Sequence, residues 1–203
     1  MSEFTYEKNN SSDIYETYEW DNTWIEHASD TKTPRVLYIG DSISCPTRRT
    51  ATLETGEKIY FDGFGTSKSL DNPVFRESLK LFTKQIPPMS AIVFNNGLHG
   101  WHLDDESEYL DYYDSFVKFL LDEYGVRVFI VLTTYIENER IERVKKRNKA
   151  ALAVAEKYSL PIIDLYTLSE ERCDLIAQDK VHFTPEGYRL FAKKIIESVE
   201  GAL

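Results

Sequence analysis

The chain has 203 residues, of which 42% are hydrophobic and 29% are charged, a composition typical of a globular protein with one domain. Its formal net charge of −10 would repel nucleic-acid phosphates, and no apolar run reaches the roughly 20 residues of a membrane helix, so we expect neither nucleic acid nor a membrane as partner. Cys45 and Cys173 are too few for a disulfide scaffold, and the first 20 residues contain no secretory leader. A cytoplasmic location is therefore expected, or an extracellular one if a leader preceded this sequence.

Residues 1–33 are acidic, aromatic and poor in aliphatic side chains. This composition predicts an N-terminal extension that packs on a domain formed by residues 34–203. The side chains expected to make that contact are aromatic: Tyr15, Tyr18, Trp20 and Trp24.

From Pro34 onward, short apolar runs alternate with longer amphipathic segments, which is the pattern of an α/β domain with a parallel sheet. Five parallel strands are predicted, at residues 35–39, 58–61, 91–95, 126–132 and 161–164. Helices are predicted near residues 74–85, 113–124, 141–155 and 185–199. Thr184 is expected to cap the last of these, with Pro185 in its first turn. The basic stretch 143–147, together with Lys149, is interpreted as the solvated face of a helix.

Ser42 follows the first predicted strand, in LYIGDSIS. Gly40 permits a tight turn there, and a helix starting near Ser42 would direct its free amides toward an oxyanion. The same pattern also fits phosphate-binding turns and plain connections, although no complete glycine-rich phosphate motif is present. Ser42 alone therefore leaves the function open.

Asp179 and His182 lie three residues apart in DKVHFTPEGY, just before the last predicted helix. A serine becomes a nucleophile when a histidine accepts its proton, and a carboxylate on the other ring nitrogen orients that histidine. Taken alone, Asp179 could be a turn residue and His182 a partly buried core residue.

Together, GDS after the first strand and DxxH before the last helix resemble the first and last sequence blocks of the SGNH/GDSL hydrolase family. The resemblance runs from about Arg35 to the C-terminus. It implies a three-layer α/β/α flavodoxin-like fold, ester hydrolysis through an acyl-serine intermediate, and no cofactor or metal. It also implies Ser42 as nucleophile, His182 as general base and then acid, and Asp179 as the residue that orients His182.

The family's oxyanion hole combines the amide of the nucleophile, the amide of a glycine after the second strand and an asparagine side chain after the third. By this resemblance the donors here are the Ser42 amide and Gly65, or Ser67 if the register shifts by two. In NNGLHGWH, His99 lies at the position of the asparagine. A neutral imidazole can donate one hydrogen bond, and Asn96 is the alternative donor.

The same stretch contains His99 and His102 in HxxH spacing, with Asp104 and Asp105 nearby, which leaves a zinc site as a minor alternative. Trp101 is a candidate for stacking on a substrate sugar or acyl group, or for packing.

The leading hypothesis is an esterase for small acyl groups, above all acetyl groups on carbohydrate, which would make a small-molecule or carbohydrate ester its partner. A lipase, lysophospholipase or acyl thioesterase on the same fold is the first alternative. A degenerate SGNH domain that binds glycans without cleaving them is the second. The sequence predicts no oligomeric state.

Overall fold

The structure, a computed structural model, describes residues 14–103 and 105–203. Its centre is a six-stranded sheet in the order β1-β3-β2-β4-β5-β6. The strands are β1 (Asp21–Trp24), β2 (Arg35–Gly40), β3 (Tyr60–Thr66), β4 (Ala91–Phe94), β5 (Arg127–Val131) and β6 (Ile162–Ile163). β2 to β6 pair in parallel, which confirms the five parallel strands predicted, whereas β1 is antiparallel to β3 and forms an additional edge strand.

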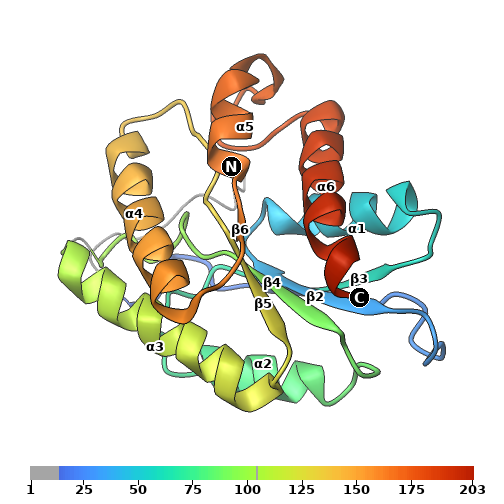
Figure 1. Ribbon diagram of the computed structural model, residues 1–203. Helices are drawn as coiled ribbons and strands as arrows, with labels where there is room; N and C mark the ends of the chain where they lie inside the picture. Colours follow the sequence, from blue (N-terminus) through green and yellow to red (C-terminus); the bar gives the residue numbers. More distant parts are fainter. Residues whose placement is uncertain (1–13, 104) are drawn as a thin grey trace.

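Helices cover both faces of this sheet, giving the predicted three layers (Figure 1). The helices are α1 (Ser44–Glu54), α2 (Phe75–Thr83), α3 (Glu106–Tyr124), α4 (Ile141–Tyr158), α5 (Leu165–Glu171) and α6 (Pro185–Val199). In the view of Figure 1, α1 and α6 lie above the sheet, while α2 and α3 lie below it. Short 3₁₀ turns follow at Cys173–Leu175 and Glu200–Ala202.

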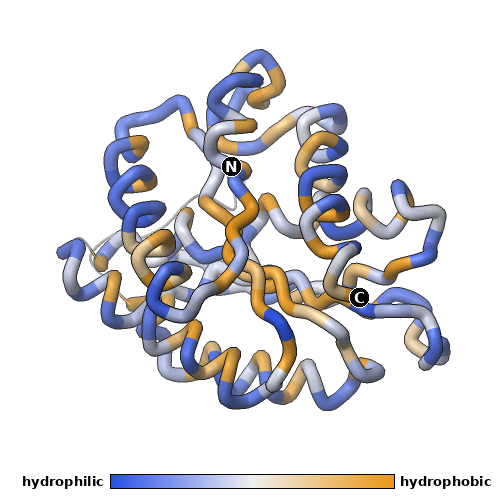
Figure 2. The backbone as a smooth tube through the Cα atoms, viewed as in Figure 1, coloured by the Kyte–Doolittle hydropathy of each residue, from blue (hydrophilic) through white to orange (hydrophobic). Residues whose placement is uncertain are grey.

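The strands are apolar on both faces because both faces are buried. In β2, Val36 and Tyr38 contribute to the core beneath α1 and α6, and Leu37 and Ile39 contribute to the core against α2 and α3. In Figure 2 the central strands are coloured mainly as hydrophobic residues, whereas the helices around them carry many hydrophilic positions.

Local signals fix the helix ends. The Asp105 carboxylate caps α3 by accepting from the amides of Ser107 and Glu108, and Gly125 ends that helix in the left-handed conformation. At α6 the Thr184 hydroxyl accepts from the Gly187 amide, as its sequence predicts.

The N-terminal extension contributes β1 to the sheet, although its residues 1–13 lie outside the described part of the chain. Arg35 and Asp62 form a buried ion pair beside it, with Nη1 2.9 Å from Oδ1. Arg35 also donates to the carbonyls of His27 and Asp30, and Asp62 accepts from the Glu26 amide. The segment after β1 is therefore bound to the first two parallel strands.

In the described residues, no helix has both the length and the apolar character needed to span a bilayer.

The order of the parallel strands reverses beside β2, because the chain moves from β2 to β3 on one side and then returns to β4 on the other. Open α/β sheets bind ligands at the carboxyl ends of the strands next to such a reversal. Ser42 follows β2 and His99 follows β4, so both lie at this edge.

Candidate active site

A chain of hydrogen bonds joins three side chains from the two ends of the domain. His182 Nε2 lies 2.8 Å from Ser42 Oγ, and His182 Nδ1 lies 2.7 Å from Asp179 Oδ2. Ser42 and His182 are half-buried and Asp179 is exposed at the rim. This order of groups can transfer the serine proton to the imidazole while the carboxylate holds the ring in place.

Ser42 is held in a tight turn between β2 and α1. A Cβ on Gly40 would lie 2.7 Å from the Cβ of Ser44, so a larger residue would push the turn apart. The Asp41 carbonyl accepts from the Ser44 amide at 3.1 Å and from its hydroxyl at 2.7 Å. Ser42 thus stands directly before the N-terminus of α1, where the helix dipole favours negative charge.

The loop that carries Asp179 and His182 is fixed by its own backbone. An antiparallel bridge joins Ile176 to Phe183, and the Ala177 amide donates to the His182 carbonyl at 2.7 Å. Phe183 is buried against Phe191 of α6 with ring centroids 4.7 Å apart. His182 is therefore anchored on both sides, by the bridge and by a core aromatic.

Asp179 is held in its ionised form. Although partial burial raises its pKa, hydrogen bonds from the backbone amides of His182 and Val181 and from the His182 ring bring the pKa below its usual value. Asp179 therefore carries a negative charge whenever His182 needs one.

Asp41 lies beneath the serine and is 2% exposed. Its Oδ1 accepts from the Ile43 amide at 3.0 Å, while Oδ2 is buried with no hydrogen-bond partner among the described residues. Burial raises the pKa of this carboxyl, and electrostatic interaction with His99 and His182 opposes that rise. Both imidazoles therefore lie within electrostatic reach of the turn that carries Ser42.

His99 is 1% exposed and faces the N-terminal segment. Its Nδ1 lies 2.7 Å from Glu16 Oε1, and its ring meets Trp20 edge-on with centroids 5.8 Å apart. Asn96, the alternative oxyanion donor, uses its side-chain amide to donate to the Lys68 carbonyl at 3.0 Å. Both side chains are thus buried, at 1% and 5% exposure, and each contacts another segment of the chain.

Gly65 lies within β3 and not in the loop after it. A Cβ at Gly65 would lie 2.4 Å from the Sγ of Cys45, so glycine lets α1 approach the strand. Ser67, the alternative register, donates its backbone amide to the Trp20 carbonyl at 3.2 Å. That amide is therefore already engaged by the N-terminal segment.

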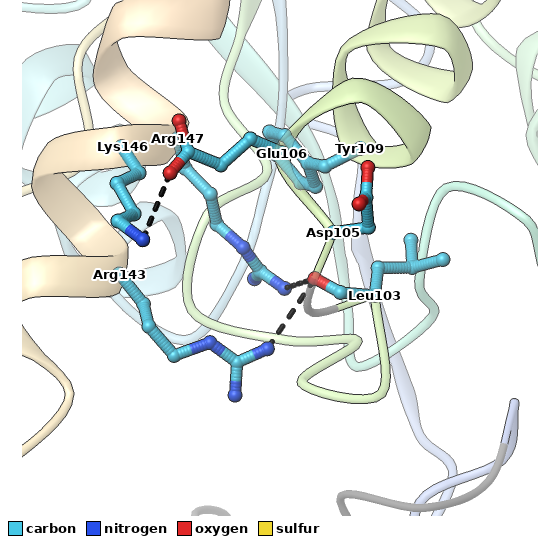
Figure 3. Close-up of a pocket in the computed structure, with 7 residues that line it drawn as sticks. All are labelled: Leu103, Asp105, Glu106, Tyr109, Arg143, Lys146 and Arg147. Atoms are coloured by element: carbon cyan, nitrogen blue, oxygen red, sulfur yellow. Dashed lines mark hydrogen bonds and ion pairs between the residues drawn. The ribbon is translucent and has the colours of Figure 1, made fainter.

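The loop at residues 97–103, which carries His99, rests on a buried arginine. Arg147 of α4 is 4% exposed and donates to loop carbonyls, those of Gly97, His99, Gly100 and Leu103. Figure 3 shows Arg143 and Arg147 both reaching the Leu103 carbonyl, with Lys146 paired to Glu106.

The interpretation of residues 143–147 as a solvated face is thus wrong for Arg147, because the loop carbonyls accept hydrogen bonds from its guanidinium, which is buried there. The hollow that these side chains line has a volume of about 20 Å³, room for about one water, so the arginines here support the loop and do not form a ligand site.

Trp101 packs against this arginine, 4.5 Å from ring centroid to guanidinium carbon, and is 4% exposed. It borders a hollow that also includes Asp179 and Arg140, whereas Ser42 lines a different one. The structure thus places Trp101 in the wall behind the Asp179 loop.

The two histidines of the HxxH pattern contact separate carboxylates. His99 meets Glu16, while His102 Nε2 lies 2.8 Å from Asp71 Oδ2. Asp105 caps α3, and Asp104 lies outside the described residues. Within residues 14–103 and 105–203, no group of three His, Cys, Asp or Glu side chains is arranged to hold a metal ion.

Ser42 and His182 open into a hollow of about 340 Å³. Its other lining residues are Trp20, Asn22, Cys45, Pro46 and Tyr188. Sequence reasoning named Trp20 only as a packing residue and missed the others, as well as Glu16. Cys45 and Pro46 directly follow the GDSIS motif, and this closeness to Ser42 in the sequence could have identified them as residues of the site.

No family model and no curated protein matches this sequence. Solved structures do match it. A GDSL-like lipase from Bacteroides thetaiotaomicron has a TM-score of 0.67 at 18% identity, covering 88% of this chain and 93% of that one. An acetyl xylan esterase has a TM-score of 0.64 at 17% identity, and the match covers 81% of this chain and 99% of that one. The C-terminal catalytic domain of a peptidoglycan O-acetyltransferase from Streptococcus pneumoniae has a TM-score of 0.62 at 20% identity. That match covers 84% of this chain and 94% of the domain. At these identities the likeness establishes a shared fold.

Proposed function

We propose that this chain, which has the fold of the GDSL/SGNH hydrolases, is a serine esterase that removes small acyl groups, above all acetyl groups, from carbohydrate. The observation that carries the proposal is the hydrogen-bonded order Asp179, His182, Ser42 at the mouth of a hollow. Comparable folds in an acetyl xylan esterase and a lipase support ester hydrolysis as the reaction class.

In this proposal Ser42 Oγ attacks the ester carbonyl as its proton passes to His182 Nε2. The imidazolium then gives that proton to the departing alcohol oxygen, leaving an acyl group on Ser42. Water attacks the acyl-serine with His182 again as base, which releases the acid and restores the serine. Asp179 remains ionised and holds the His182 ring.

The lining of the hollow favours a small acyl group on a polar alcohol. Among the described residues that line it, none is Leu, Ile, Val or Phe, whereas a long fatty chain needs an aliphatic groove. Its volume of about 340 Å³ is at the small end of ligand sites. Trp20 and Tyr188 line it with aromatic rings, on which a sugar ring can pack. The lipase alternative is therefore the weaker one.

Hydrolysis of p-nitrophenyl acetate and p-nitrophenyl octanoate in the presence of a chelator tests the proposal. We expect chelator-resistant hydrolysis that favours acetate. Preference for octanoate would support the lipase alternative. Absence of hydrolysis, together with no labelling of Ser42 by a fluorophosphonate, would support a non-catalytic glycan-binding domain.

His99 is proposed as the side-chain donor to the oxyanion. His99 Nδ1 lies 2.7 Å from Glu16 Oε1, so a hydrogen bond to the oxyanion would come from Nε2.

Replacing His99 with alanine is expected to lower kcat on the order of 10²-fold, because it removes one donor to the transition state. Asn96→Ala is the matched control and should lower kcat less, since its amide already binds the Lys68 carbonyl. Steady-state kinetics on p-nitrophenyl acetate would measure both. The opposite ranking would assign the donor role to Asn96.

Hydrolysis is expected to increase as the pH is raised from 5 to 8, because His182 must be neutral to accept the serine proton. The pKa of Asp179 lies below its usual value, so this carboxylate is ionised over that whole range and adds no second step. Acetate release measured from pH 5 to 8 would show the rise. A flat profile would remove His182 from the role of base.

A further inference from the structure

A second hollow adjoins the one at Ser42 and extends it along the sheet edge. It measures about 210 Å³ and is lined by Asn22, Trp24, Cys45, Arg48 and Arg49. Asn22 and Cys45 line both hollows, so the two are continuous there. The result is a groove between β1 and α1 that begins at the candidate nucleophile and ends at Trp24.

One face of the N-terminal segment forms the wall of this groove. In an extended chain, residues two apart point to the same side, so Trp20, Asn22 and Trp24 share a face. The register confirms which face it is, because Asn22 lies opposite Gly65 and Trp24 opposite Gly63. Both glycines face α1, since a Cβ on either would collide with an α1 side chain. Four residues of strand separate the two tryptophans by about 13 Å.

Glycines on β3 are what make the floor of the groove flat. A Cβ at Gly63 would lie 2.0 Å from Cδ of Arg48, and a Cβ at Gly65 would lie 2.4 Å from Sγ of Cys45. These two α1 side chains therefore lie directly on the strand. Arg48 also donates to the side-chain oxygen of Asn22 at 2.7 Å, which holds the wall to the floor.

Trp24 is 50% exposed, at the end of a strand whose residues are all exposed. An exposed indole at the end of a groove presents a flat face on which the apolar side of a sugar ring can stack. Asn22 and Arg49 border it with polar groups that can bond hydroxyls. The charge of Arg49 is offset by Glu26, whose carboxylate oxygens both lie 2.8 Å from Nη1. Arg48, which also lines the groove, bonds instead to the neutral backbone and side-chain oxygens of Asn22.

We propose that the Trp20–Asn22–Trp24 groove binds the sugar chain of an acylated oligosaccharide, so that the enzyme acts on polymers and not only on single sugars. This inference rests on the proposed function of Ser42. It assigns to the N-terminal segment a subsite that recognises several linked sugars beyond the ester.

The variant Trp24→Ala tests the groove, and the quantity to compare is kcat/KM. The substrates are p-nitrophenyl acetate and three series of O-acetylated glycans, derived from xylan, glucan and peptidoglycan. Each series is measured as monomer and as oligomer. The wild type should prefer the oligomers in at least one series. Trp24→Ala should raise KM for that oligomer about tenfold while leaving p-nitrophenyl acetate unchanged, because a stacking contact is lost away from the reacting atoms. Trp24→Tyr should recover most of the loss. Tyr112→Ala, an exposed aromatic on α3, is the matched control and should change nothing.

The outcomes separate the groove from the active site. Wild-type enzyme that hydrolyses p-nitrophenyl acetate but gains nothing from chain length in any series would overturn the groove and leave the esterase intact. Equal loss on all substrates in Trp24→Ala would also overturn it. A dimer that dissociates in Trp24→Ala would show that a second copy occupies this face instead. Failure of the wild type on p-nitrophenyl acetate would count against the esterase itself.

Discussion

Alanine in place of Ser42 is expected to reduce kcat on p-nitrophenyl acetate on the order of 10⁴- to 10⁶-fold, with a KM close to that of the wild type. The Ser42 hydroxyl, 2.8 Å from His182 Nε2, is the group that would form the acyl intermediate. Neither Asp179 nor His182 can take over that role. The substitution removes one oxygen from a half-buried side chain, so the fold should be unaffected. Steady-state kinetics together with thermal unfolding would separate catalysis from stability.

Ser198→Ala is the matched control, since this serine on α6 is half-buried like Ser42 and its hydroxyl donates to the Lys194 carbonyl of its own helix. It should retain full activity and full labelling by a fluorophosphonate, whereas Ser42→Ala should lose both. Hydrolysis that persists in Ser42→Ala would require a different nucleophile. The serine mechanism would then be abandoned.

The sequence predicts the central sheet and the three-residue chain at its edge because both depend on local patterns. The other parallel strands are apolar runs, whereas β3 contains Asp62 and two glycines and extends past the predicted residues 58–61 to Thr66. The cap at Thr184 can be predicted from the Thr-Pro pair. Ser42 and His182 are 140 residues apart, yet each lies next to the end of a predictable element. The carboxyl ends of parallel strands meet at one edge, so the fold itself brings them together.

The surroundings of the site depend on long-range packing, which the pattern does not specify. β1 is four exposed residues with no apolar alternation, and it becomes a strand only because the edge of β3 offers unpaired backbone groups. The partner of His99 is Glu16, 83 residues away in a segment whose composition indicates only an extension. From the sequence alone, Arg147 resembles the surface cations around it. Its burial depends on the carbonyls of residues 97–103, to which it donates.

Replacing Asp62 with alanine is expected to lower the free energy of unfolding by about 3 to 5 kcal/mol, because it leaves the Arg35 guanidinium buried without a counter-charge. Both side chains are almost completely buried, at 1% and 0% exposure. The same carboxylate accepts from the Glu26 amide at 2.8 Å, so its loss also frees a backbone donor in the segment that follows β1. Urea unfolding followed by circular dichroism would measure the change.

We expect the loss of stability in Asp62→Ala to come from the lost negative charge and not from the lost side-chain volume. Two further variants distinguish these causes. Asp122→Ala removes an exposed carboxylate paired with Lys118 on α3 and should change the free energy by less than about 0.5 kcal/mol. The double variant Arg35→Met with Asp62→Leu should recover part of the loss, because no unpaired charge stays buried. Should Asp62→Ala cost no more than Asp122→Ala, the pair would not be what binds the N-terminal segment to the sheet. The groove wall formed by β1 would then depend on its strand pairing with β3 alone.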